Sequence, residues 1–128
     1  MSRKKFSPLR AAILPAAAAA LALGLASCSP AAPASIEVAP DAILLDVRTA
    51  AEFAEGHLDG AEQLDFNGGE VAAAIPGLDP DAEYLVYCRS GNRSGQAIAL
   101  MEQAGFSKLT NLGSLEQAAA ATGIEIVR

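Results

Sequence analysis

The sequence predicts an α/β fold with three layers, in which a mainly parallel central sheet is flanked by helices. Two continuous apolar runs, residues 42–47 and 84–87, are typical of parallel strands that are buried on both faces. Helix-capping residues follow the first run, and a turn rich in Gly, Ser and Arg follows the second. Because strand and helix signals alternate along the chain, we expect parallel strands joined by helical crossovers.

The early part of the domain is predicted to contain two strands and one helix. We expect residues 36–38 to form a short first strand and residues 42–47 to form the buried strand. Thr49 then begins a helix, because the run Thr-Ala-Ala-Glu is a capping-box pattern. Gly56 is placed to end this helix.

A third strand and a short helix are expected next, with residues 61–66 as the strand. Asn67 is expected to cap a helix over residues 71–74, because Asn-Gly-Gly-Glu repeats the pattern of a cap followed by an acid. The dipeptide Ile-Pro76 ends that helix, since a residue before proline disfavours the helical conformation. Residues 78–83 contain Asp and Pro and are expected to be a loop.

The helix that follows the strand at 84–87 is expected over residues 94–104, with apolar positions along one face. Gly105 occupies the place of a left-handed residue after a helix, and Phe106 is spaced to pack back on Met101, as in a Schellman motif. The remaining predicted elements are a strand at 108–112, a helix at 114–122 and an extended segment at 124–127.

The N-terminus has the features of an export signal. A basic stretch precedes an Ala-rich apolar run, residues 11–25, which is shorter than a typical membrane span. The run ends in Leu-Ala-Ser-Cys28, which resembles the bacterial lipobox. This resemblance implies cleavage before Cys28, attachment of a diacylglyceryl group to its thiol (a lipoprotein modification of the palmitate kind), and anchoring at the cell envelope. The alternative is an ordinary secretory signal with an incidental cysteine.

These features predict a signal peptide at 1–27, a lipidated cysteine with a tether at 28–35, and one domain at 36–128. Removal of the basic leader leaves a net charge near −10, since five basic and fifteen acidic residues remain. So acidic a body argues against nucleic acid as a partner, and we expect membrane contact through the lipid alone. We expect a monomer, on either membrane of the envelope.

Cys88 is the candidate catalytic residue. It follows the apolar run at 84–87 and begins a short loop that leads directly into a helix. Free backbone N–H groups, the positive end of the helix dipole and two nearby arginines favour the thiolate, which is the nucleophilic form. With Cys28 acylated, no second thiol remains for an intramolecular disulfide, and a lone exported thiol is expected to be reactive. The alternative is a buried structural cysteine.

Several segments, in order and at compatible spacing, together resemble the single-domain rhodanese family over most of the predicted domain. The segments are Leu-Asp-Val-Arg48, Glu52-Phe53, Gly-His57-Leu-Asp-Gly-Ala, Cys88-Arg-Ser-Gly-Asn-Arg93-Ser, Gly105-Phe106 and Leu112-Gly113. The chain departs from the family where many relatives have a Gly-Gly pair followed by a Trp, because it has Gly113-Ser114 and no Trp. It is also unusually polar at residues 62–64.

The resemblance implies a sulfurtransferase of the thiosulfate sulfurtransferase type that needs no cofactor. Cys88 would attack a small anionic sulfur donor such as thiosulfate, become a persulfide, and pass sulfur to a thiol or cyanide-like acceptor. The residue types suit this chemistry, because glycine permits a tight turn, loop N–H groups can cradle an anion, and arginine binds oxyanions. The candidate substrate-binding residues are Arg89, Ser90, Gly91, Asn92, Arg93 and Ser94.

These roles have alternatives. The two arginines can instead be solvated charges or partners of acids, and Ser94 is a candidate helix cap. Related phosphatases and arsenate reductases use a Cys-x5-Arg loop, one residue longer than Cys-x4-Arg here, so the shorter loop favours sulfur chemistry. A further alternative is a non-catalytic, lipid-anchored module that binds a partner or senses oxidants, although inactive relatives usually lack the cysteine.

The remaining polar motifs are expected to be structural. His57 is the only histidine, so a zinc cluster or a Cys–His–Asn arrangement has little support, and we expect His57 to have a packing or turn role. Asp46, Arg48 and Glu52 are expected to form an ion pair and capping group around the buried strand. We therefore predict no metal site.

Overall fold

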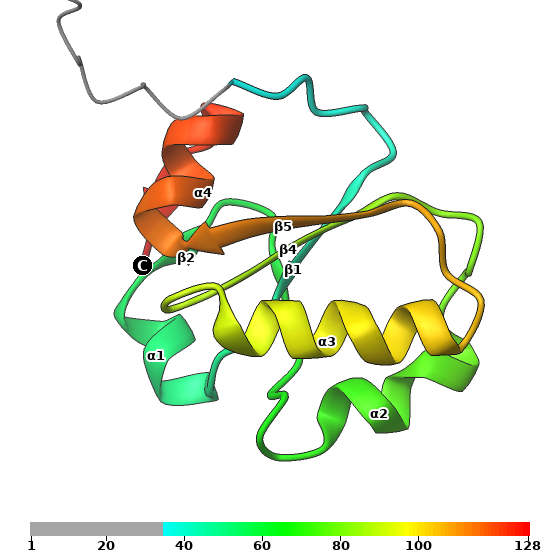
Figure 1. Ribbon diagram of the computed structural model, residues 1–128. Coiled ribbons are helices and arrows are strands. Elements are labelled where there is room, and N and C mark those ends of the chain that lie inside the picture. The colour runs from blue at the N-terminus through cyan, green and yellow to red at the C-terminus, as the bar shows by residue number, and fades with distance from the viewer. Residues whose placement is uncertain (1–34) are drawn as a thin grey trace, which may run out of the picture.

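The computed structural model describes residues 35–128 and contains a four-stranded parallel sheet (Figure 1). Its strands are β1 Ile43–Asp46, β3 Glu62–Gln63, β4 Tyr84–Cys88 and β5 Leu109–Ser114. They lie in the order β3-β1-β4-β5, and each neighbouring pair is parallel. The predicted α/β fold with a mainly parallel sheet is confirmed.

Helices cover both faces of the sheet and complete the three predicted layers. They are α1 Ala50–Glu55, α2 Glu70–Ala74, the 3-10 turn η1 Ile75–Gly77, α3 Asn92–Gln103 and α4 Leu115–Thr122. Helices α2 and α3 lie on one face, α4 lies on the other, and α1 lies near one end of the strands (Figure 1). A small antiparallel pair, β2 His57–Leu58 with β6 Ile126–Val127, joins the region after α1 to the C-terminal segment.

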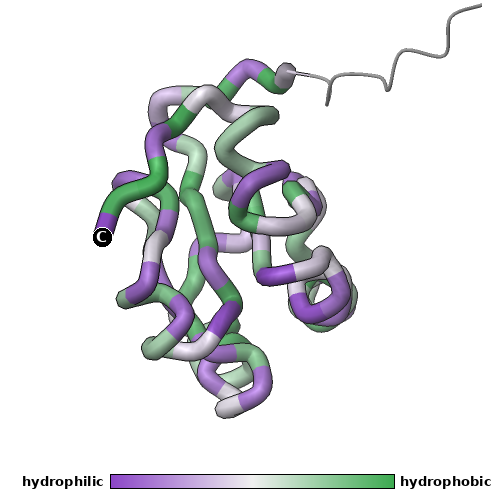
Figure 2. The backbone as a smooth tube through the Cα atoms, turned by 90° about the vertical axis from the view of Figure 1, so that its left-hand side faces the viewer, coloured by the Kyte–Doolittle hydropathy of each residue, from purple (hydrophilic) through white to green (hydrophobic). Residues whose placement is uncertain are grey.

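Strand β4 is buried on both faces because a separate hydrophobic core covers each one. Tyr84, Val86 and Cys88 belong to the core that includes residues of α2 and α3. Leu85 and Tyr87 belong to the core that includes residues of α4. All five residues are at most 1% exposed, which explains why the strand reads as an unbroken apolar run. Figure 2 shows hydrophobic residues along the central strands and hydrophilic residues mainly on outer turns.

The predicted first strand at residues 36–38 is wrong. The Ile36 N–H bonds to the Ala121 carbonyl at 2.9 Å, so this segment lies against α4 instead of joining the sheet. Ile36 and Val38 pack against the core on the α4 side. The segment at 61–66 contributes a strand only at β3, two residues long.

Helix α2 begins differently from the prediction, because Asn67 is not its cap. Gly69 occupies the N-cap position in a left-handed conformation, and no side chain caps the helix there. Two acidic side chains hold the preceding turn instead. Glu70 accepts a hydrogen bond from the Asp65 N–H at 2.6 Å, and Asp65 accepts one from the Gly68 N–H at 3.1 Å.

The predicted starts of α1 and α4 and the predicted ending of α3 are confirmed. The side chain of Thr49 accepts a hydrogen bond from a first-turn N–H of α1, and Ser114 forms a capping box at α4. After α3, Gly105 has a φ of +96° and the Phe106 N–H bonds to the Met101 carbonyl at 3.1 Å. This is the predicted Schellman ending, and it directs Phe106 into the core.

The predicted signal peptide, the candidate lipidation residue Cys28 and the tether up to residue 34 lie outside the described residues. Within residues 35–128, none of the helices is both long enough and apolar enough to cross a membrane.

Candidate active site

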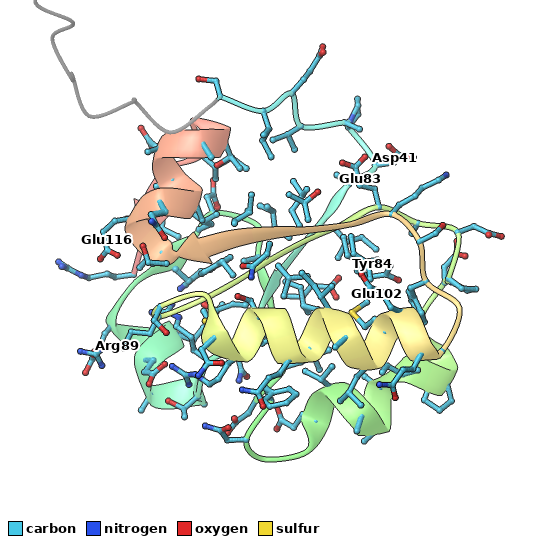
Figure 3. All side chains as sticks on the ribbon, in the orientation of Figure 1. Asp41, Glu83, Tyr84, Arg89, Glu102 and Glu116 are labelled. Atoms are coloured by element: carbon cyan, nitrogen blue, oxygen red, sulfur yellow. The ribbon has the colours of Figure 1, made fainter. Side chains whose placement is uncertain are left out.

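The carboxyl ends of the parallel strands lie at one edge of the sheet, and Cys88 is the last residue of β4. Figure 3 shows Arg89 and Glu116 at this edge, whereas Asp41 and Glu83, which precede β1 and β4, lie toward the opposite end. In parallel α/β folds, ligands bind beyond the carboxyl ends of the strands. The geometry therefore places Cys88 where such folds carry their sites.

Neutral hydrogen-bond donors surround the Cys88 sulfur. The residue is fully buried, its Sγ accepts the Gly91 N–H at 3.0 Å, and the Ser94 hydroxyl lies 3.5 Å away. Burial raises the pKa of the Cys88 thiol. Hydrogen bonds from the Ser94 hydroxyl and from the N–H groups of Ser94, Ser90 and Gly91 lower the pKa, and together they outweigh the effect of burial. The resulting pKa lies below its ordinary value. The site thus favours the thiolate through dipoles of the loop and of the first turn of α3.

Gly91 is required by the shape of this loop. Its φ is +92°, a left-handed value that residues with a side chain rarely adopt. A Cβ added there would lie 3.3 Å from the Cα of Gly113 in β5. The turn that aims the Gly91 N–H at the Cys88 sulfur therefore needs glycine both for its conformation and for its close approach to β5.

Asn111 in β5 ties this loop to the sheet, and the sequence reasoning missed it. Its Nδ2 donates to the Gly91 carbonyl at 3.0 Å. Its Oδ1 accepts the Ser94 hydroxyl at 2.7 Å and the Gly113 N–H at 2.9 Å. The available sequence signal was an asparagine in the predicted strand, two residues before a glycine.

Ser94 is not the helix cap that the sequence suggested. Helix α3 begins at Asn92, with Gly91 at the cap position, and Ser94 is a fully buried residue of its first turn. Because one hydroxyl carries one proton, the Asn111 oxygen and the Cys88 sulfur are alternative acceptors for it. The Ser94 hydroxyl therefore lies within hydrogen-bonding reach of both the Cys88 sulfur and Asn111.

Arg93, a predicted substrate-binding residue, forms an ion pair with Glu52 of α1. Its guanidinium lies 2.9 Å and 3.3 Å from the two carboxylate oxygens. The two side chains are 17% and 23% exposed. The expectation that Glu52 caps its own helix is wrong, because Glu52 supplies only its backbone N–H to the cap at Thr49.

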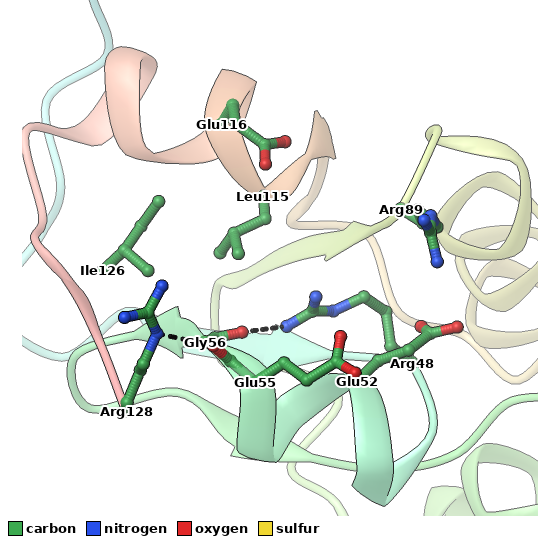
Figure 4. Close-up of a pocket in the computed structure, with 9 residues that line it drawn as sticks. All are labelled: Arg48, Glu52, Glu55, Gly56, Arg89, Leu115, Glu116, Ile126 and Arg128. Atoms are coloured by element: carbon green, nitrogen blue, oxygen red, sulfur yellow. Dashed lines mark hydrogen bonds between the residues drawn. The ribbon is translucent and has the colours of Figure 1, made fainter.

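Arg89 is exposed and lines a pocket of about 320 Å³ between α1, the start of α4 and the end of β4. Arg48, Glu52 and Arg128 also line this pocket. Figure 4 shows Arg89 and Arg128 at opposite ends of it. No ion pair among residues 35–128 involves Arg89. Of the two loop arginines, Arg89 is therefore the one whose charge is available to a ligand.

The other candidate loop residues differ in what they present. The side chains of Ser90 and Asn92 are exposed, and Asn92 accepts a hydrogen bond from Gln96 at 3.2 Å. Ser90 and Gly91 line a second cavity of about 510 Å³, formed with residues of β5 and α4. Toward Cys88, Ser90 contributes its backbone N–H alone.

Asp46 and Arg48 form the expected structural ion pair beside this site. The Arg48 Nη2 lies 2.7 Å from Asp46 Oδ2 and 2.6 Å from the Gly56 carbonyl that ends α1. Burial lowers the pKa of Arg48, but its hydrogen bonds and charge pairing with Asp46 outweigh burial and raise it. The guanidinium also lies 5.6 Å from the centre of the Tyr87 ring. The pair joins β1, α1 and β4.

His57 has the expected packing role. Its ring stacks on Phe53 with 3.7 Å between the ring centres, and its Nδ1 lies 2.9 Å from the Phe53 carbonyl oxygen. In the part of the chain that the structure describes, no three His, Cys, Asp or Glu side chains are placed to share a metal ion.

Comparisons with known proteins agree with this geometry. The model of the rhodanese-like domain family matches residues 34–121. A sulfurtransferase from Allochromatium vinosum is 37% identical over 87 residues, which are 68% of this chain and 79% of that protein. The thiosulfate sulfurtransferase GlpE of Pseudomonas putida is 44% identical over 66 residues, which span 52% of this chain and 58% of that protein.

Solved structures show the same likeness. The rhodanese-like domain of the Anabaena Alr3790 protein matches with a TM-score of 0.60 and 26% identity, over 71% of this chain and 91% of that one. A rhodanese with anions from E. coli matches with a TM-score of 0.56 and 27% identity, over 68% of this chain and 98% of that one.

Proposed function

This chain belongs to the rhodanese-like domain family, a family with sulfurtransferase members, and we propose that it transfers sulfane sulfur through a persulfide on Cys88. The observation that supports this most directly is the set of hydrogen-bond donors around the Cys88 thiol, the one free thiol within residues 35–128, at the end of β4. These donors lower the pKa of Cys88 although burial opposes this, so the nucleophilic form is favoured.

In the first half of the reaction, the Cys88 thiolate attacks the outer sulfur of a donor such as thiosulfate. A new S–S bond forms to Cys88, the S–S bond of the donor breaks, and its electron pair leaves with sulfite. The products are a persulfide anion and a sulfite dianion, so the total charge is unchanged. The same N–H groups that stabilise the thiolate also stabilise the persulfide.

In the second half, a nucleophilic acceptor attacks the outer sulfur of the Cys88 persulfide. The S–S bond breaks, its electron pair returns to Cys88 as thiolate, and the acceptor leaves with the sulfur atom. With cyanide the product is thiocyanate, and with a thiolate it is a persulfide of that thiol. No redox cofactor is required, because the attacking nucleophile supplies the electron pair of each new bond and the leaving group keeps the pair of each broken bond.

An anionic donor finds suitable groups at this loop. Arg89 offers a guanidinium without an ion-pair partner in the described domain, and guanidinium groups bind oxyanions well. An anionic donor also agrees with the solved structure of an E. coli rhodanese with anions, which covers 68% of this chain. We assign donor binding to Arg89 and to the backbone of the loop from Ser90 to Ser94.

The test is the intact mass of the purified protein after treatment with thiosulfate and removal of excess reagent. We expect an adduct of one sulfur atom that is absent from Cys88→Ser and is discharged by cyanide as thiocyanate. No adduct, together with no thiocyanate formation, would refute the proposal and favour a non-catalytic binding or redox-sensing module.

For localisation, we propose an envelope lipoprotein anchored through Cys28, with the membrane touched by the lipid alone. The support is the resemblance of Leu-Ala-Ser-Cys28 to a lipobox, after an apolar run typical of an export signal. A fatty-acid probe supplied to cells should label the wild type and not Cys28→Ala. Soluble, unlabelled wild-type protein would contradict this proposal.

A further inference from the structure

The ion pair between Arg93 and Glu52 reduces the positive charge that the active-site loop presents to a sulfur donor. An arginine at this place in the loop would ordinarily attract an anion. Here both carboxylate oxygens of Glu52 accept hydrogen bonds from the Nη2 of Arg93, at 2.9 Å and 3.3 Å. The side chains are mostly buried, so water screens the pair less than it screens pairs on the surface.

The backbone of Glu52 is also held in place within α1. It lies in the first turn of α1, where its backbone N–H bonds to the Thr49 hydroxyl at 3.2 Å. It lines the pocket that contains Arg89, the residue next to Cys88. The carboxylate therefore stands between α1 and the start of α3, at the rim of the pocket beside the loop (Figure 4).

The net positive charge around the loop is therefore smaller than the arginines in the sequence suggest. Asp46 offsets the charge of Arg48, and Glu52 offsets that of Arg93. Arg89 is left as the cation of the loop, on a domain that carries fifteen acidic and five basic residues. On the loop itself, a donor with two negative charges meets one guanidinium without an ion-pair partner, that of Arg89.

From this arrangement we infer that Glu52 is a specificity-determining residue that favours sulfur donors of low negative charge over the thiosulfate dianion. The inference rests on the proposed function, because it concerns the donor of the same Cys88 reaction. The chemical class is a singly charged sulfane sulfur compound, such as an organic thiosulfonate anion. Its repulsion by the Glu52 carboxylate is half that of a dianion at the same position.

The reaction with such a donor is balanced in the same way. The Cys88 thiolate attacks the terminal sulfur of the thiosulfonate, the S–S bond of the donor breaks, and its electron pair leaves with an organic sulfinate. The same Cys88 persulfide is formed from either donor. A comparison of the two donors therefore isolates donor charge at a common product.

The alternative is that the ion pair has only a structural role and joins α1 to α3. A structural role predicts that loss of the carboxylate makes the loop less rigid and slows the reaction with every sulfur donor alike. A specificity role predicts unequal changes that follow the charge of the donor. The ratio of the two rates separates these cases, because a purely structural effect cancels in it.

The experiment measures kcat/KM of the full-length, detergent-solubilised protein with thiosulfate and with methanethiosulfonate, using cyanide as the acceptor. Glu52→Gln should raise the value for thiosulfate about tenfold and that for the thiosulfonate about threefold, since the lost repulsion scales with donor charge. Glu52→Asp keeps the charge and should keep the wild-type donor ratio.

Glu55→Gln is the matched control, because Glu55 is an exposed residue of the same helix that lines the same pocket. No hydrogen bond in the described domain uses its carboxylate, and its substitution removes the same charge. It should change either value less than twofold. An unchanged donor ratio in Glu52→Gln, or the same change in Glu55→Gln, would overturn the inference.

The failure of the proposed function is a separate outcome. If neither donor leaves a sulfur adduct on Cys88 of the wild type or of Glu52→Gln, persulfide chemistry itself is refuted, and the inference falls with it. If adducts form and the donor ratio stays constant, the proposed function stands and only the role of Glu52 is refuted.

Discussion

Two neighbouring strands, β1 and β4, end side by side in buried ionisable groups that the fold treats in opposite ways. At the end of β1, the Asp46 carboxylate is surrounded by one cation, with three Arg48 side-chain hydrogen bonds of 2.7–3.1 Å. At the end of β4, the Cys88 sulfur is surrounded by backbone N–H groups and a hydroxyl. Both groups are fully buried.

The difference teaches how one sheet edge can hold both a structural charge and a reactive one. The charge of Arg48 cancels that of Asp46, and the pair holds three elements together. Asp46 therefore has no uncompensated charge with which to bind a ligand. Dipoles stabilise the thiolate of Cys88 without cancelling its charge, so the sulfur remains nucleophilic. The first arrangement should dominate stability, and the second should dominate reactivity.

The largest expected effect is on stability, at the end of β1. Asp46→Ala leaves Arg48 buried without its partner, and loss of one member of a buried pair typically costs about 3–5 kcal/mol. We expect a fall of this size in the free energy of unfolding measured in urea. Asp59→Ala, at an exposed acid, should change it by less than about 0.5 kcal/mol. Equal effects of the two substitutions would show that the buried pair is not structural.

Parts of this picture follow from sequence alone. The strand at 84–88 is predictable because it is apolar on both faces, and the ending of α3 is predictable because Gly105 and Phe106 are local signals. The position of Cys88 at a strand end follows from the same reasoning. These features depend on residues that are close in sequence.

The rest depends on segments that meet only in the fold. Asn111 contacts Gly91 across 20 residues, and Glu52 meets Arg93 across 41, so neither role is visible in the local pattern. Residues 36–38 look like a strand, yet their partner is a carbonyl at the end of α4. In the candidate site, the positions of the candidate nucleophile Cys88 and of Gly91 were predictable, and the contacts that hold them were not.

The next effect is on the loop at the end of β4. Gly91→Ala places a side chain at a φ of +92° and within 3.3 Å of Gly113, at a cost of about 1–2 kcal/mol for the left-handed conformation alone. We expect the fraction of protein that forms the persulfide, measured by intact mass, to fall by more than the fraction of protein that remains folded. Gly77→Ala is the control, because its added Cβ meets nothing within 4 Å. If Gly91→Ala keeps full activity, the turn does not set the geometry of the sulfur.

The smallest expected effect is on the titration of Cys88. Ser94→Ala removes a hydrogen-bond donor to the thiolate, so we expect the pKa of Cys88 to rise toward its ordinary value. Because the folded pKa lies below the unfolded one, the thiolate contributes stability above the unfolded pKa, and this is lost as pH falls through the folded pKa.

This sign gives a measurement by urea unfolding. The wild type should gain stability relative to Cys88→Ser as the pH rises toward about 8.5, and Ser94→Ala should gain less. Ser107→Ala, at an exposed serine, should behave like the wild type. A gain in Ser94→Ala equal to that of the wild type would exclude the hydroxyl as a stabilising donor.

The most direct test of the contrast between the two strand ends is the pH dependence of Cys88 alkylation in the wild-type protein. The rate with iodoacetamide would be followed by mass mapping of the peptide that contains Cys88. Stabilisation of the thiolate by the loop predicts a midpoint clearly below the free-cysteine value of about 8.5. A midpoint at or above that value would show that burial prevails and that the loop does not activate the sulfur.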